Sequence, residues 1–393
     1  MTPRSTGDQS KTTDGGANLG ATGVPARKSE RDLGQARAVL QGWFARLHPE
    51  AQDVRVGEVR TPTSSGVANE TLLCDASWTD GATQTSGRFV VRVNSPNFLY
   101  KDVDLAVHTG MYETLRDEPG IPVPAVVGYE ADPSVLGEPF FVMEHIEGRV
   151  PSVAPPFHTE GWVAELPTES RAAMWRDAVA VMSRLHAVDP ARIPFLDRPS
   201  LGSSGLEQDL RASLDYGRWI ARGRALPVID ATATWLVDHL PRSPGTGLAW
   251  GDARVGNMIF QDDCVVAVLD WDMVSLAGAE SDLAWWTIMD LMYTTSAGVE
   301  RLPGIGGPTE TIALWEELAG RPARDLHFHL VSGAYRMATI LVRLADLLAE
   351  AGVLPPDLAA DMVANNTAIQ YLATMLDLPH DGPIVTPWPG LDG

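Results

Sequence analysis

Residues 247–273 are the one strand-like stretch in a second half whose apolar pattern is otherwise helical, and they constrain the fold most strongly. Two apolar runs, residues 258–260 and 265–269, flank the turn-forming sequence Asp-Asp-Cys at 262–264, which predicts a β-hairpin. Apolar residues before and after this stretch recur at helical spacing. We therefore expect a small hairpin embedded in a helical lobe.

The first half of the chain has a different pattern. Short β-type runs, bounded by turn signals such as Asp80-Gly81, predict a small sheet. The expected strands are residues 54–59, 70–78, 88–93, 125–129 and 139–144, with helices at 32–47 and 102–116. The expected fold is α+β and bilobal, with a β-rich lobe at 31–146 and a larger helical lobe at 147–393. Residues 1–30 are polar, lack an apolar period and predict a disordered tail.

Composition narrows the function. The formal net charge of −21 argues against a nucleic-acid partner, because phosphate backbones require a basic face. The same charge favours attraction of a cationic ligand, with plain solubility as the alternative. No apolar run is long enough for a transmembrane helix and no export signal is visible, so we expect a cytoplasmic protein without membrane contact. Cys74 and Cys264 lie in strand-like runs, which predicts that both are buried.

Three polar residues around the expected hairpin are candidates for chemistry. Asp252, four further residues and then Asn257 precede the hairpin, and Asp270 follows it. Protein kinases use this order, with a carboxylate that accepts the proton of the substrate hydroxyl and oxygen ligands for Mg²⁺. A hairpin brings its two ends together, so Asn257 and Asp270 can meet at one metal ion. The alternative is that all three are turn residues, but a charge that ends an apolar run, as Asp270 does, requires a partner.

Longer motifs make the similarity specific. WGDARVGNMIF at 250–260 and VVAVLDWDMVSLAGAESDLAWW at 265–286 resemble the aminoglycoside phosphotransferase family of kinase-like enzymes. GIPVPAVV at 120–127 and GEPFFVMEHIEGRVP at 137–151 resemble the branch found with acyl-CoA dehydrogenases and in mycobacteria. The resemblance covers roughly residues 50–290. It implies a protein-kinase-like fold, ATP and Mg²⁺ as cofactors, and a small-molecule hydroxyl as acceptor.

The resemblance also assigns roles to residues. It implies that Asp252 is the catalytic base, that Asn257 and Asp270 bind Mg²⁺, and that Arg254 steadies the transferred phosphoryl group. It places Asp282 as a buried brace of the catalytic loop. It further implies that the backbone of a connector between the lobes binds adenine, and this connector comprises Glu144, His145 and Ile146.

Two positions depart from the family pattern. Trp250 stands where the family usually has His, and we expect it to pack rather than react. Arg92 stands where a strand lysine usually holds the ATP phosphates, and its acidic partner is open between Asp104 and Glu113. The alternative for Arg92 is a side chain that points to solvent from an alternating strand. Between two expected strands, residues 64–69 resemble a shortened glycine-rich loop that covers the phosphates with Ser65 and Gly66, or form only a turn.

Three functions remain to be compared. The first is ATP-dependent transfer of the γ-phosphoryl group to a hydroxyl of an aminoglycoside-like or other hydroxylated metabolite. The second is a catalytically inactive kinase-like protein that binds a nucleotide or another ligand, which the intact set of Asp252, Asn257 and Asp270 opposes. The third is a protein kinase, which the short distance from Asp270 to Asp282 opposes because it leaves no room for a long activation segment.

Overall fold

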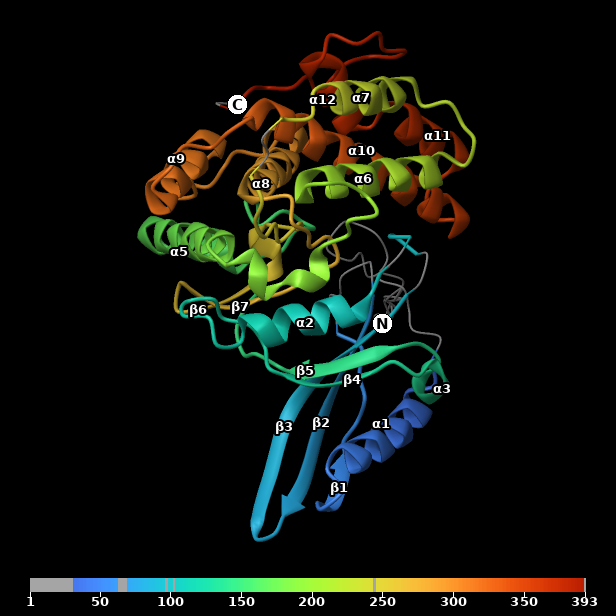
Figure 1. Cartoon of the computed structure of the whole chain (residues 1–393), viewed down its shortest axis with the longest axis vertical. Coiled ribbons are helices and arrows are strands. Elements are labelled where there is room, and N and C mark those ends of the chain that lie inside the picture. Colours follow the sequence, from blue (N-terminus) through green and yellow to red (C-terminus); the bar gives the residue numbers. More distant parts are fainter. Residues whose placement is uncertain (1–30, 63–68, 96–97, 102, 243–244, 392–393) are drawn as a thin grey trace, which may run out of the picture.

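The computed structural model of the chain describes residues 31–62, 69–95, 98–101, 103–242 and 245–391. The expected tail at 1–30, and Ser65 and Gly66 of the expected phosphate loop, lie outside the described residues. The described part has two lobes, as the sequence predicts: a small antiparallel sheet with flanking helices, and a larger helical part (Figure 1).

The first lobe is built on a five-stranded antiparallel sheet with the strand order β1-β2-β3-β5-β4. Its strands are β1 (Gln52–Val56), β2 (Glu70–Asp80), β3 (Thr83–Val93), β4 (Val126–Glu130) and β5 (Phe140–Glu144). Helix α1 (Leu33–Leu47) and the short helix α3 (Pro133–Leu136) pack together beside this sheet, and α2 (Leu105–Leu115) lies between the sheet and the helical lobe (Figure 1).

Alternating side chains of β5 explain how the sheet contributes to two apolar clusters. Phe140 and Val142 belong to the apolar cluster that includes the buried face of α1. Phe141 and Met143 belong to the large cluster that runs from α2 into the helical lobe. Because successive side chains of a strand point to opposite faces, one short apolar run joins the sheet to both layers.

The second lobe consists mainly of helices around α10 (Leu326–Glu350), which packs against α8 (Ala279–Tyr293). Its other helices are α4 (Trp162–Glu165), α5 (Thr168–His186), α6 (Gly205–Ala221), α7 (Pro227–Asp238), α9 (Pro308–Ala319), α11 (Pro356–Asn365) and α12 (Thr367–Met375), with short 3₁₀ turns at Pro190–Arg192, Pro194–Leu196, Val255–Asn257 and Thr295–Ala297. The expected hairpin is present as β6 (Met258–Gln261) and β7 (Cys264–Val268). Among the described residues, none of the helices has both the length and the apolar character that crossing a bilayer requires.

Two expectations are wrong in detail. Apolar residues at helical spacing predict one continuous helix over 356–376, but the structure has two. Asn366 has an extended backbone, and its side chain caps α12 by accepting a 3.1 Å hydrogen bond from the Ile369 amide. Cys264 is exposed rather than buried, because it directly follows the hairpin turn, whereas Cys74 in the middle of β2 is buried as expected.

Candidate active site

A cleft of about 280 Å³ lies between the two lobes and collects most of the residues singled out from the sequence. Arg92 of β3 and the connector 144–146 line it from the first lobe, and Arg254, Asn257 and Asp270 line it from the second. His108 and Tyr112 of α2 also line it. The hairpin and the sheet thus bring into one cavity residues that are far apart in the sequence.

Asp252 is held by donors from three side chains. Its Oδ1 accepts a 2.7 Å hydrogen bond from the indole Nε1 of Trp285, and its Oδ2 accepts a 2.6 Å bond from Asn257 Nδ2. Arg254 Nε lies 3.0 and 2.9 Å from the two carboxylate oxygens. These contacts fix the orientation of a carboxylate that the surrounding loop leaves partly accessible, with 14% of its side chain exposed.

The loop that carries Asp252 is held in place by hydrogen bonds to the buried Asp282. Asp282 at the start of α8 is fully buried and accepts hydrogen bonds from the amides of Trp250 and Gly251, at 2.7 and 2.8 Å. His186 Nε2 lies 2.8 Å from the same carboxylate, and its Nδ1 accepts a 2.8 Å bond from the indole of Trp315. The indole donor on Nδ1 places the His186 proton on Nε2, where it points to Asp282.

Trp250 packs in the core, as expected for the residue that replaces the family's His. It is fully buried, and its Nε1 donates to the carbonyl oxygens of Leu269 and Asp270. Gly251 beside it has a φ of 94°, and a Cβ there would lie 2.1 Å from the Met273 carbonyl oxygen. The sharp turn before Asp252 therefore requires glycine.

Asn257 and Asp270 meet at the open end of the hairpin. Met258 pairs with Val268, and the Leu269 amide donates a 2.9 Å hydrogen bond to the Asn257 carbonyl. Burial and the neighbouring Asp272 carboxylate raise the pKa of Asp270 above its ordinary value, while the Arg92 guanidinium opposes this. Such a carboxylate gains from a cation placed beside it.

The donor set at this point fits Mg²⁺. The Asn257 amide nitrogen is used by Asp252, which leaves its amide oxygen for a cation, and Asp270 supplies a carboxylate. No cluster of three or more His, Cys, Asp or Glu suited to a metal occurs in the described part of the chain. Two protein oxygens suit Mg²⁺, which keeps several waters and takes its other ligands from substrate phosphates.

Arg92 points into the cleft rather than to solvent. Its Nη1 donates a 2.8 Å hydrogen bond to Thr71 Oγ1, its partner across the β2–β3 ladder, and its Nη2 lies 4.0 Å from Asp270 Oδ2. Neither of the two expected partners of Arg92, Asp104 and Glu113, contacts its guanidinium. Asp104 caps the start of α2 through the Ala106 amide, and Glu113 is exposed. The carboxylate beside Arg92 comes instead from the far end of the hairpin.

Arg254 has one nitrogen that is not bonded to protein. Burial lowers the pKa of its guanidinium, but the charge and hydrogen bond of Asp252, together with Tyr293 and the charge of Asp270, raise it by more. Its Nη1 is buried and lacks a hydrogen-bond partner among the described residues. A Cβ added to Gly256 would lie 2.4 Å from this nitrogen, so the glycine makes room for the guanidinium.

Two of the three amides of the connector are hydrogen-bonded within the protein. The amides of Glu144 and His145 donate to the carbonyl oxygens of Ala125 and Arg88, at 2.9 and 3.0 Å. Within the described residues the Ile146 amide makes no such bond. Among the three predicted connector residues, Ile146 therefore has the amide that is free to bind a nucleotide base.

A second cavity of about 330 Å³ is lined by Asp272, two residues beyond Asp270 of the cleft, and by Tyr100, Tyr216 and Met273 among others. Its acidic residues are all paired: Asp209 with Arg336 at 2.7 Å, Asp215 with Lys101 at 2.7 Å, and Asp272 with His108 at 3.0 Å. The chain's excess of negative charge is therefore not available as unpaired carboxylates in this cavity.

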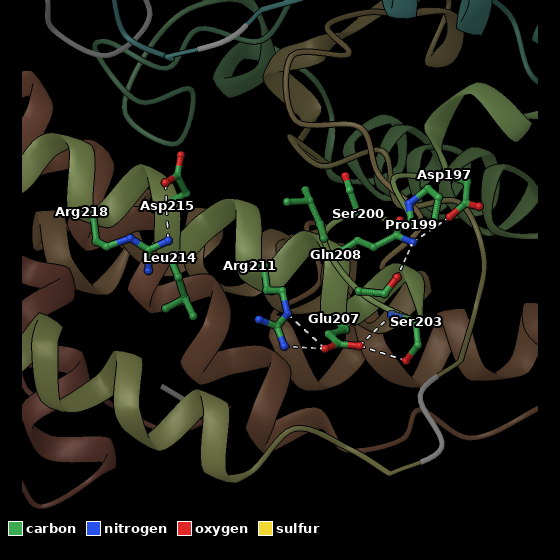
Figure 2. A pocket seen from close by; sticks show the side chains of 12 residues that line it. Asp197, Pro199, Ser200, Ser203, Glu207, Gln208, Arg211, Leu214, Asp215 and Arg218 are labelled. Atoms are coloured by element: carbon green, nitrogen blue, oxygen red, sulfur yellow. Dashed lines mark hydrogen bonds and ion pairs between the residues drawn. The ribbon is translucent and has the colours of Figure 1, made fainter.

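An open hollow of about 800 Å³ lies along α6 (Figure 2). Its polar side chains bond mainly to one another, as in the pair Glu207–Arg211 and the bond from Gln208 to Asp197. Leu201 and Asp215 line both this hollow and the 330 Å³ cavity, so the two are neighbours.

Sequence reasoning missed two residues of this region. The apolar sequence around Trp285 predicts a core residue, and it is buried, but its indole N–H faces Asp252. His108 was not singled out, although its spacing of four from Tyr112 places both on one face of a helix and was the available signal. At the end of a predicted helix His186 is expected to be a structural histidine, and it lies in a buried network.

An antiparallel sheet joined to a helical lobe, with the hairpin at the cleft, defines a kinase-like bilobal fold. The chain belongs to the phosphotransferase enzyme family, whose model matches residues 61–320. Among solved structures, a candidate aminoglycoside phosphotransferase of Ralstonia eutropha JMP134 has a TM-score of 0.58 at 20% identity, covering 84% of this chain and 95% of that one. The gentamicin complex of APH(2")-IIa has a TM-score of 0.52 at 13% identity, covering 84% and 97%.

Curated relatives are longer proteins. Acyl-CoA dehydrogenase family member 11 of Rattus norvegicus is 31% identical over 202 residues, which is 51% of this chain and 25% of the relative. Acyl-CoA dehydrogenase family member 10 of Mus musculus is 31% identical over 173 residues, or 42% and 15%. Probable acyl-CoA dehydrogenase IBR3 of Arabidopsis thaliana is 26% identical over 301 residues, or 70% and 34%. The chain spans about a third or less of the length of these relatives.

Proposed function

We propose that this protein transfers the γ-phosphoryl group of ATP to a hydroxyl of a small molecule. The observation that carries the proposal is the 280 Å³ cleft lined by Arg92, Asn257 and Asp270, with Asp252 hydrogen-bonded to Asn257 at its edge. Phosphoryl transfer depends mainly on positioning and on charge stabilisation, and this arrangement supplies a cation, metal ligands and a base. Membership in the phosphotransferase family supports the same reaction.

The nucleotide would lie in the cleft with its base at the Ile146 amide and its phosphates toward Arg92. Arg92 is held by Thr71 and by the charge of Asp270, so its guanidinium is oriented before ATP binds. Asn257 and Asp270 would hold Mg²⁺, which would neutralise part of the charge of the phosphates. The predicted Ser65 and Gly66 loop would cover the phosphates from above.

The reaction itself would use Asp252 and Arg254. Asp252 accepts the proton of the acceptor hydroxyl while that oxygen forms a bond to the γ-phosphorus and the bond to the leaving ADP oxygen breaks. Arg254, through the nitrogen that has no protein partner, donates to the transferred phosphoryl oxygens. The products are ADP and a phosphate monoester of the acceptor.

We place the acceptor in the 330 Å³ cavity next to Asp272, beside the hollow along α6. Tyr100 and Tyr216 offer aromatic surface there, and the paired acids offer no unpaired negative charge. This cavity therefore lends no support to attraction of a cationic acceptor by net charge. A small-molecule acceptor, and cytoplasmic ATP as the donor, fit two cysteines that are both free thiols.

The test is acceptor profiling. Purified protein, ATP and Mg²⁺ are incubated with a library of hydroxylated compounds, and products are detected by mass spectrometry as a mass gain of one phosphoryl group. The expected result is ADP formation that depends on one class of acceptor and is lost in Asp252→Asn. Nucleotide binding without transfer to any acceptor would instead favour the inactive binding protein, and labelling of protein would favour a protein kinase.

A further inference from the structure

Asp272 is a buried carboxylate on which several segments converge. His108 Nε2 of α2 lies 3.0 Å from its Oδ1, and both side chains are only 3% exposed. Asn69, just before β2, donates a second hydrogen bond of 2.9 Å to the same oxygen, and its own Oδ1 accepts from the Ser95 amide after β3. Two donors from the first lobe thus hold one acid of the second lobe.

The same carboxylate is directly linked to the proposed metal ligand. The Asp272 amide donates a 3.2 Å hydrogen bond to Asp270 Oδ1. Trp271 between them is buried, and its ring packs in a T-shaped arrangement with that of Tyr112, with the centroids 6.0 Å apart and an interplanar angle of 83°. His108 and Tyr112 are one helical turn apart. One face of α2 therefore contacts both Trp271 and Asp272, the two residues that follow the proposed metal ligand Asp270.

We propose that His108 is a positioning residue for the metal ligand Asp270, acting through Asp272. The proposal rests on the proposed function, because it presumes that Asp270 binds Mg²⁺ with the nucleotide. In protein kinases, a glutamate on the corresponding helix orients the strand lysine that binds the ATP phosphates, and the proposed role of His108 differs from that arrangement. Here the acids of α2, Asp104 and Glu113, point elsewhere, and Arg92 contacts Thr71 and Asp270 without α2.

This difference separates two contributions to nucleotide binding. A displaced α2 would move the segment 270–272 and so disturb the metal, while the contact of Arg92 with Thr71 within the sheet would remain. Mutation of groups that orient metal ligands typically lowers metal affinity by about 10–100-fold. Loss of His108 should therefore weaken the magnesium-dependent part of nucleotide binding and spare the rest.

Calorimetry of the full chain with a non-hydrolysable ATP analogue, with and without Mg²⁺, measures both parts. In His108→Leu the affinity with Mg²⁺ should fall by about 10–100-fold, and the affinity without Mg²⁺ should change by less than about threefold. His108→Gln keeps a donor for Asp272 and should recover part of the loss. Asp270→Ala marks complete loss of the metal effect, and Glu113→Gln, an exposed change on the same helix, should behave as the wild type.

Hydrogen–deuterium exchange of the free protein provides a readout without nucleotide or metal. Amides of residues 270–274 should exchange faster in His108→Leu, and those of Glu113→Gln should not. Should His108→Leu fail to fold, Asp272→Asn tests the same contact, because the amide keeps the shape of the side chain and removes its charge.

Unchanged exchange over 270–274, or an equal loss of affinity with and without Mg²⁺, overturns the role of His108. Absence of any magnesium effect in the wild-type chain overturns the proposed function instead. The exchange measurement then still decides whether His108 holds the segment 270–272.

Discussion

The indole Nε1 of Trp285 donates a 2.7 Å hydrogen bond to Oδ1 of Asp252. The Arg336 guanidinium lies 5.8 Å from the centre of the same indole and pairs with Asp209, which lines the 330 Å³ cavity. One indole thus lies between the proposed base, to which it donates, and Arg336, a lining residue of the proposed acceptor cavity.

Replacement of Asp252 by Asn should cut turnover by about 10²–10⁴-fold, because an amide cannot accept the hydroxyl proton. The melting temperature should stay close to wild type, since Asn can still accept from Trp285. Trp285→Phe is the companion variant: it keeps the packing of the ring and removes the donor, and turnover should fall by a smaller factor. Steady-state kinetics and thermal melting measure both, and an Asp252→Asn enzyme with wild-type turnover would contradict the assignment.

Arg92→Ala should raise KM for ATP by about 10–100-fold, because a charge-assisted hydrogen bond to phosphate is lost. KM for the acceptor should stay nearly constant. Arg92→Lys should recover only part of the loss, since an ammonium cannot reproduce the forked contacts of a guanidinium. Arg55→Ala, an exposed change in β1, is the control. Wild-type kinetics in Arg92→Ala would mean that another residue holds the phosphates.

Gly256→Ala tests the placement of Arg254. The new Cβ would lie 2.4 Å from Arg254 Nη1 and 2.9 Å from Val153 Cγ1, so the guanidinium must move. Because the end of an arginine side chain moves easily, stability should change little, but turnover should fall by about 10²-fold or more if Arg254 stabilises the transferred group. Gly42→Ala, in α1 with no atom within 4 Å, should stabilise the fold by about 0.5–1 kcal/mol and leave turnover unchanged. Equal turnover in the two variants would argue against a catalytic role for Arg254.

His158 should make the fold sensitive to acid. Burial, and then the charge of Arg301, lower the pKa of His158 to about 4, and its Nδ1 accepts a 3.2 Å bond from the Leu302 amide. A lowered pKa means that the folded state favours the neutral form of His158. The contribution of this histidine to the free energy of unfolding is therefore complete above the unfolded pKa near 6.5 and is lost as the pH falls toward 4. At pH 5 the wild type should lose about 2 kcal/mol more than His158→Asn, relative to pH 7. Chemical denaturation at the two pH values measures this, and parallel losses in both proteins would refute it.

Local sequence was sufficient for the hairpin and its flanking polar residues. Asn257 and Asp270 approach one another because the two strands between them pair, and this pairing is encoded by two apolar runs and a turn. The alternation in β5 likewise follows from four consecutive apolar residues, which predict a strand buried on both faces. Such features need no knowledge of distant contacts.

Contacts between distant segments were not predictable. The partner of Arg92 depends on how the hairpin of one lobe meets the sheet of the other, so the sequence left only the nearby acids Asp104 and Glu113 as choices. The His108–Asp272 pair joins two polar residues whose own neighbours give no sign of each other. Asn366 ends a helix because its side chain caps the next one, yet the apolar pattern runs through it.

Residues 98–101, which follow β3, form a second attachment between the lobes besides the connector at Glu144. The Tyr216 hydroxyl donates to the Leu99 carbonyl at 2.8 Å, Arg343 Nε donates to the Phe98 carbonyl at 2.8 Å, and Lys101 pairs with Asp215. The bonds of Asn69 and His108 to Asp272 hold the two lobes together at a further place. A wider opening of the cleft therefore requires that both the contacts at 98–101 and those at Asp272 break, while the covalent connector stays intact.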